Sequence, residues 1–190
     1  VAERSWDELQ RLILTGADGG RMLLLEEVVE IFRPTAIDLR LEIKADHTGT
    51  PYPGVPAKVV DMLRAHDMLG RTMLTSFQLG TVREIGAAGV PDRRLWILAP
   101  KVLVDIGGFD TAMDLAEASG VANLAVRQDM LDETIVAAAR ARGFGIGGWA
   151  CNAPEAMERM FSLGVDVFTT DRPDLAIAIR QGRASAERVA

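Results

Sequence analysis

The chain has 190 residues, of which 48% are hydrophobic and 25% charged, and these values are typical of one globular domain spanning residues 1–190. They exclude a disordered or collagen-like chain, and the single cysteine, Cys151, excludes a disulfide scaffold. The formal net charge of −6 argues against a nucleic-acid binder, which needs a basic surface. No segment approaches the roughly 20 apolar residues of a membrane span.

The predicted elements alternate between helix and strand. Ser5 and Glu8 have the spacing of a capping box at a first short helix, and a second helix is predicted over residues 23–32. Strands are then predicted at residues 36–44, 72–77, 94–99, 122–128, 144–151 and 165–170. Each is followed by a predicted helix, over residues 55–69, 79–88, 111–119, 132–142, 154–163 and 173–181. We expect residues 182–190 to fray.

Six strand–helix units predict an α/β fold with a parallel sheet, either doubly wound or closed as a TIM barrel. The strand at 36–44 favours the barrel. Its charged residues Asp38, Arg40, Glu42 and Lys44 alternate with apolar ones, so they share one face. A strand buried between two helix layers is apolar on both faces, whereas a barrel lumen accepts charge. A full (β/α)8 barrel has eight units, so this chain supplies about six units of an incomplete barrel.

Glu42 and Lys44 are the sharpest functional signal in the sequence. They lie on one face at the carboxyl end of a strand, where barrel enzymes place their chemistry. A carboxylate there suits Mg²⁺ or Ca²⁺, and an ammonium group beside it can neutralise a phosphate oxygen. The alternative is a salt bridge that only satisfies two charges in the lumen.

Other candidates follow the ends of later strands. Trp149 can form an apolar wall for a substrate or simply fill the barrel. Asn152 precedes Pro154 as a helix N-cap would, and Asp171 can cap the last helix or tie down a neighbouring loop.

Three further candidates lie on the side where the mouth of the barrel is expected. Ser76 and Phe77 end the second predicted strand, and no His–Asp arrangement supports Ser76 as a nucleophile. His47, in the loop just past Lys44, is a candidate acid–base group or substrate contact, although such loop histidines are more often solvated.

Taken together, the motifs resemble the glycerophosphodiester phosphodiesterase family over nearly the whole chain. The matching pieces, in order, are Leu24–Val28 (Leu-Glu-Glu-Val), Leu41–Lys44 (Glu-Ile-Lys), Thr75–Phe77 (Ser-Phe), Trp149–Asn152 (Trp-Thr-x-Asn) and Gly164–Pro173. Each motif is weak alone, but five in order and at the right spacing are specific.

The resemblance implies a TIM barrel that uses a divalent metal, Mg²⁺ or Ca²⁺. Such an enzyme hydrolyses glycerophosphodiesters to glycerol 3-phosphate and an alcohol in phospholipid-derived metabolism. Glu42 would then be a metal ligand, Lys44 would face the substrate phosphate, and Trp149 would lie against the apolar side of the substrate. His47, Ser76, Phe77, Asn152 and Asp171 would be neighbours of the site.

The chain also departs from the family pattern. The family's first two strands, which carry its catalytic histidines and two more metal ligands, have no match, and we expect them upstream of Val1. Ala150 stands where the family motif has Thr. A non-catalytic phosphate-binding or interaction module from the same barrel is therefore the alternative function, and another phosphate-binding barrel enzyme is a third. We expect a small-molecule phosphodiester as the partner and a cytoplasmic location. The chain can also assemble as a homo-oligomer.

Overall fold

The computed structural model describes residues 3–15, 20–90 and 92–187. In this part of the chain, six parallel strands form one sheet in the order β1-β2-β3-β4-β5-β6, so each strand pairs with its neighbours in sequence. The strands are β1 (Leu39–Glu42), β2 (Thr72–Ser76), β3 (Arg94–Leu98), β4 (Asn123–Arg127), β5 (Gly145–Trp149) and β6 (Val167–Phe168).

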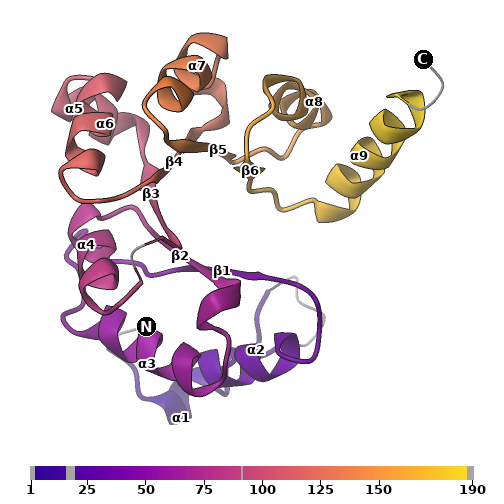
Figure 1. Ribbon diagram of the computed structural model, residues 1–190. Helices are drawn as coiled ribbons and strands as arrows, with labels where there is room; N and C mark the ends of the chain where they lie inside the picture. Colours follow the sequence, from indigo (N-terminus) through magenta and orange to yellow (C-terminus); the bar gives the residue numbers. More distant parts are fainter. Residues whose placement is uncertain (1–2, 16–19, 91, 188–190) are drawn as a thin grey trace.

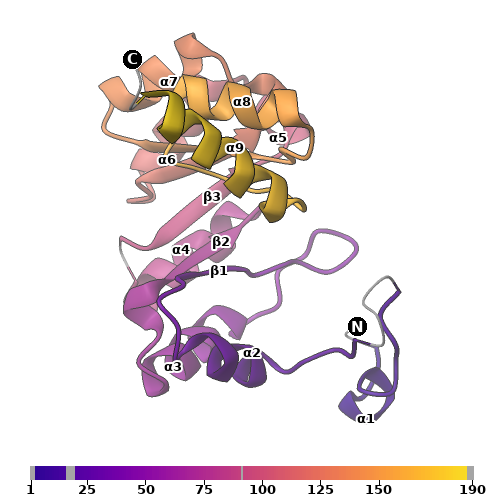
Figure 2. The same cartoon turned by 90° about the vertical axis from the view of Figure 1, so that its right-hand side faces the viewer.

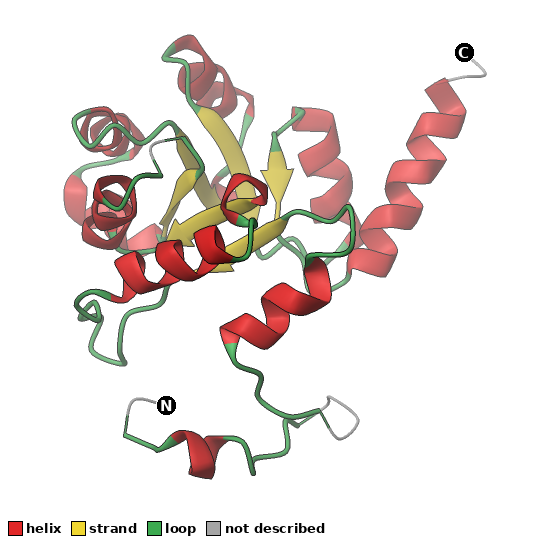
Figure 3. Ribbon diagram, turned by 60° about the horizontal axis from the view of Figure 1, so that its bottom comes forward, coloured by secondary structure: helices red, strands yellow, loops and turns green. Residues whose placement is uncertain are grey.

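The helices cover the convex side of this curved sheet, and its concave side is open (Figure 1). They are α2 (Leu25–Phe32), α3 (Val55–Ala65), α4 (Leu79–Ala87), α5 (Pro100–Ile106), α6 (Phe109–Glu117), α7 (Glu133–Ala141), α8 (Pro154–Leu163) and α9 (Pro173–Glu187). The short α1 (Trp6–Leu9) lies apart from the sheet (Figure 2), and the strands stand inside the row of helices (Figure 3). The arrangement is an incomplete TIM barrel, which confirms the predicted fold class.

The main core lies between the outer face of the sheet and the helices. Outward side chains such as Leu98, Leu124 and Ile146 are buried there. The inner face holds a smaller apolar cluster of Leu95, Ile97 and Ala125. Burial of apolar residues on both faces is what the near-continuous apolar runs of β3 and β4 require.

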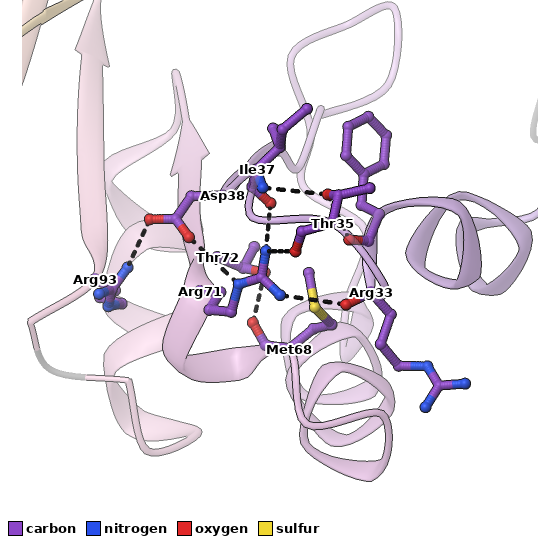
Figure 4. A network of polar contacts seen from close by, with 9 residues as sticks. Arg33, Thr35, Ile37, Asp38, Met68, Arg71, Thr72 and Arg93 are labelled. Atoms are coloured by element: carbon purple, nitrogen blue, oxygen red, sulfur yellow. Dashed lines mark hydrogen bonds and ion pairs between the residues drawn. The ribbon is translucent and has the colours of Figure 1, made fainter.

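An arginine fixes the segment that leads into β1 (Figure 4). Arg71 donates to the carbonyl oxygens of Thr35 at 2.6 Å and Ile37 at 2.8 Å, and its Nε lies 3.5 Å from Asp38. Its other terminal nitrogen donates to the Arg33 carbonyl. Because three of these contacts are with main-chain carbonyls, the entry to β1 is held largely by its backbone.

The structure corrects several predicted boundaries. β1 is Leu39–Glu42 rather than residues 36–44, and the Ile37 carbonyl before it accepts from Arg71. The helix predicted to residue 69 ends at Ala65, since Asp67 adopts a left-handed conformation with φ of 57°. β6 is only Val167–Phe168, against a prediction of residues 165–170.

One helix was not predicted, and another is longer than predicted. α5 was not predicted, although Pro100 at its start and Gly107 after its end, with φ of 94°, are ordinary helix signals. α9 continues to Glu187, so the expectation that the tail frays from Gly182 was wrong for residues 182–187. The remaining residues of the predicted tail, 188–190, lie outside the described ranges.

Candidate functional site

A cavity of about 380 Å³ opens at the carboxyl ends of the strands. It gathers side chains from β1, β2 and β3 and from the segments that end or follow β5 and β6. Five predicted site residues line it: Glu42, Phe77, Trp149, Asn152 and Asp171. The other lining residues are Arg40, Thr75, Ile97, Ala150 and Thr169.

Glu42 lines this cavity and forms an ion pair with Lys44, which is not one of the lining residues and lies at the rim. The Lys44 Nζ donates to Glu42 Oε1 at 2.7 Å. The Lys44 side chain is 73% exposed and that of Glu42 is 29% exposed, so water reaches the pair. The predicted pairing is therefore present, but it does not serve to neutralise two buried charges. The Glu42 carboxylate and the Lys44 ammonium both remain accessible to a ligand.

Arg40 lies deeper on the same face of β1. Its Nη1 donates to the Thr169 hydroxyl at 2.9 Å, across the lumen from the first strand to the segment after the last. Partial burial lowers the pKa of the Arg40 guanidinium, and the nearby Glu42 charge opposes that shift. The guanidinium stays protonated, so it is a fixed positive charge inside the cavity.

Two aromatic rings make the opposite wall. Phe77 and Trp149 meet edge to face, with ring centroids 5.5 Å apart and an interplanar angle of 86°. The Trp149 indole Nε1 donates to the Leu98 carbonyl at 3.2 Å, which fixes the ring orientation. The cavity therefore has a charged side on β1 and an apolar side on β2 and β5.

Asn152 joins the turns that follow β5 and β6. Its side-chain oxygen accepts from the Asp171 backbone N–H at 2.8 Å, and its Nδ2 donates to the Asp171 carboxylate at 2.7 Å. The N-cap residue of α8 is Ala153, so Asn152 is not the helix cap that its position before Pro154 suggested. Asp171 ties down the neighbouring turn, the second of the two roles weighed for it. Within the turn after β5, Ala150 has a left-handed φ of 62°.

Ser76 and His47 lie outside this cavity. The Ser76 hydroxyl is buried, donates to the Ile43 carbonyl at 2.7 Å and accepts from the Gln78 N–H at 3.1 Å. It lines a smaller cavity of about 210 Å³ together with Glu42 and Lys44. These bonds give Ser76 a structural function at the end of β1. His47 lines neither cavity.

Five cavity residues, Arg40, Thr75, Ile97, Ala150 and Thr169, were not among the predicted site residues. For Arg40 and Thr75, the signal that could have found them is strand alternation. Arg40 shares the face of Glu42, Thr75 shares that of Phe77, and each lies two positions earlier in its strand.

Comparison with known proteins identifies the family. The pattern of the glycerophosphoryl diester phosphodiesterase family matches residues 1–175. The chain belongs to this family.

The described structure also resembles solved structures. One, from Agrobacterium tumefaciens str. C58 and named a glycerophosphoryl diester phosphodiesterase, has 32% identity and a TM-score of 0.90, with 95% of this chain and 72% of that chain covered. An Oleispira antarctica phosphodiesterase, solved in complex with the product sn-glycerol-3-phosphate, has 18% identity and a TM-score of 0.76 over the same shares. A search of curated proteins gives no match.

These findings confirm the resemblance seen in the sequence, the barrel fold and the enzyme class. They leave the residue roles as predictions. Across the described ranges, no three His, Cys, Asp or Glu side chains come together as a set that could hold a metal ion. Nor is any helix in those ranges both long and apolar enough to traverse a bilayer.

Proposed function

We propose that this cavity binds and hydrolyses a glycerophosphodiester, releasing glycerol 3-phosphate and an alcohol. The observation that carries the proposal is the cavity itself. Glu42 ends β1 and lines the cavity opposite its aromatic wall, with Lys44 paired to it, at the end of the barrel where TIM-barrel chemistry takes place. Family membership and the product complex of the Oleispira antarctica relative support this reaction.

In this proposal Glu42 is one ligand of a divalent cation, Mg²⁺ or Ca²⁺. A carboxylate oxygen suits either ion, and a bound cation would stabilise charge on a phosphoryl oxygen. Glu42 alone does not make a metal centre, and the described residues supply no set of three ligands. No step of the reaction is therefore assigned through the cation.

The other residues are assigned by the chemistry of a phosphodiester. Lys44 binds an oxygen of the phosphate, because its ammonium lies at the rim and carries three donors. Phe77 and Trp149 pack against the carbon atoms of the substrate. Asn152 and Asp171 hold the turns at the mouth in place.

The setting of the reaction is also part of the proposal. Its substrate is a small soluble diester derived from phospholipid. We place the reaction in the cytoplasm, since the lone, buried Cys151 has no need of an oxidising compartment.

The test is release of sn-glycerol 3-phosphate from glycerophosphocholine by a chain that also carries the family's first two strands, with Mg²⁺, with Ca²⁺ and with EDTA. Glu42→Gln keeps the side-chain size and removes the charge, so we expect turnover to fall about 100-fold or more. Lys44→Met should raise KM or slow turnover. Lys101→Met is the matched control, because Lys101 also pairs with a carboxylate at 2.7 Å but lies on α5, away from the cavity.

The outcomes separate the candidate functions. Full activity of Glu42→Gln at saturating metal would contradict the assignment of Glu42. No turnover by the unsubstituted chain, together with retained phosphate binding, would favour the non-catalytic phosphate-binding module. Turnover that is equal with and without EDTA would instead favour another phosphate-binding barrel enzyme.

A further inference from the structure

The lumen holds a second cavity, of about 340 Å³, at the opposite end of the strands. It is lined by residues that begin the strands, among them Asp38, Leu95, Asn123, Gly145 and Asp166. Of the residues that line these two cavities, Arg40 is the one that belongs to both. The Arg40 side chain, bonded to Thr169, thus separates the two cavities and forms the floor of the upper one.

The hydrogen bonding of Arg40 differs from that of arginines that brace the fold. Arg71 donates to three main-chain carbonyls, and Arg159 donates to the carbonyls of Leu131 and Gln128 and to the Gln128 side chain. The Arg40 side chain, within the described part of the chain, makes one hydrogen bond, to the Thr169 hydroxyl. A guanidinium has five N–H donors, so most of those of Arg40 remain for a ligand in the cavity.

Thr169 is suited to act with Arg40. Its hydroxyl oxygen accepts the Arg40 hydrogen bond, which leaves the hydroxyl proton to be donated elsewhere. Both side chains line the upper cavity. Two donors from opposite ends of the sheet therefore converge on its floor, below the Lys44 ammonium at the rim.

We propose that Arg40 and Thr169 form an anion-binding floor that positions the phosphate group of the substrate. The planar guanidinium presents two parallel N–H groups to two phosphate oxygens, and the Thr169 hydroxyl donates to one of them. Lys44 then holds the phosphate from above and Arg40 from below, while the carbon atoms of the substrate lie along Phe77 and Trp149. This inference rests on the proposed function for the identity of the anion.

The experiment measures binding of inorganic phosphate and of sn-glycerol 3-phosphate to the full chain by calorimetry, in the presence of EDTA. Arg40→Met keeps an unbranched side chain and removes the charge and donors. We expect it to weaken the affinity for both anions by roughly 10- to 100-fold, the loss expected for a charge-assisted hydrogen bond. Thr169→Val keeps the shape of the side chain and should weaken the affinity roughly 3- to 10-fold.

Arg127→Met is the matched control. Arg127 also ends a strand, but its guanidinium is already paired with Asp129 by two hydrogen bonds of 2.7 Å, and it does not line the cavity. We expect its anion affinity to equal that of the unsubstituted chain. An equal loss in Arg127→Met and Arg40→Met would overturn the proposal, because it would show a general effect of surface charge.

Other results of the binding and activity measurements also test the proposal. Failure of the unsubstituted chain to bind either anion, or unchanged affinity in Arg40→Met, would overturn the proposal. If Arg40→Met does not fold, the anion affinity of Thr169→Val is used instead: a weaker affinity supports the proposal, and an unchanged affinity overturns it. Anion binding that depends on Arg40 without any hydrolysis of glycerophosphocholine would support the floor and refute the proposed function. If the enzyme hydrolyses glycerophosphocholine and Arg40→Met changes neither KM nor the anion affinity, the proposed function is supported and the anion-binding floor is refuted.

Discussion

Gly147, in the middle of β5, faces the lumen where β5 and β6 pair, and we predict that Gly147→Ala destabilises the fold and impairs the site. A Cβ atom at this position would lie 2.7 Å from the Val167 carbonyl oxygen and 2.9 Å from Val167 Cγ1. The closer contact is with main chain, which cannot rotate away as a side chain can. The two strands must therefore move apart at the Gly147–Val167 pair.

The expected cost follows from the cost of overpacking. Adding a methyl group to a filled position costs about 1–3 kcal/mol when the neighbours must shift. In a chain of this size, 1 kcal/mol lowers the melting temperature by about 2–4 °C, so we expect a decrease of roughly 2–12 °C. The displacement also reaches Thr169, whose backbone N–H donates to the Gly148 carbonyl at 2.9 Å.

Thermal unfolding followed by circular dichroism checks this prediction, and phosphate affinity reports the effect on the cavity. Gly80→Ala is the control. Gly80 lies in α4 with no heavy atom within 4 Å of an added Cβ, and alanine is the better helix former by about 0.5–1 kcal/mol. A Gly147→Ala variant as stable as Gly80→Ala would refute the steric argument.

Three further predictions test the surroundings of the site. Ser76→Ala leaves the buried Ile43 carbonyl without its 2.7 Å partner and should lower the unfolding free energy by about 1–3 kcal/mol in urea titrations. Asn152→Ala removes three hydrogen bonds between the turns after β5 and β6, and should speed the hydrogen exchange of the Asp171 backbone N–H relative to the unsubstituted chain, as measured by NMR. Burial raises the pKa of the Cys151 thiol from 9.0 to about 11, which keeps it protonated at neutral pH. Alkylation by iodoacetamide should therefore be slow in the native chain and fast in urea, and rapid native labelling would contradict the burial.

The alternation of side chains along the strand at residues 36–44 was enough to predict the barrel. Charged residues every second position require an inner face that can tolerate charge, and the structure places Arg40 and Glu42 on the cavity that this face lines. The six strands were predicted because each is short, carries apolar residues on at least one face and is followed by a helix signal. Their ends were less predictable, since β1 is only Leu39–Glu42 and β6 only Val167–Phe168, although single main-chain hydrogen bonds continue past both strands at Ile43 and Thr169.

The site was only partly predictable. Glu42 and Trp149 end strands and carry familiar chemistry, so local sequence indicates them. The importance of Thr169 depends on Arg40, which is 129 positions away in the chain. No local pattern contains that contact, because it arises only when the sheet curves and brings the first and last strands toward each other. Asn152 was misread for the same reason, since its true partner is Asp171 on the next turn.

The glycines of β5 explain why the cavities lie at two levels of the lumen. Gly145 and Gly147 face inward and carry no side chain, and an added Cβ at Gly145 would lie 2.5 Å from the Asn123 side-chain oxygen. Both glycines line the lower cavity. Two positions further along, Trp149 fills the same face of β5 and makes the wall of the upper cavity. Arg40 crosses the lumen to Thr169 at the boundary between these levels, where the inner face of β5 changes from glycine to tryptophan. The position of the anion-binding floor therefore depends on the side chains that β5 lacks as well as on those that β1 and Thr169 provide.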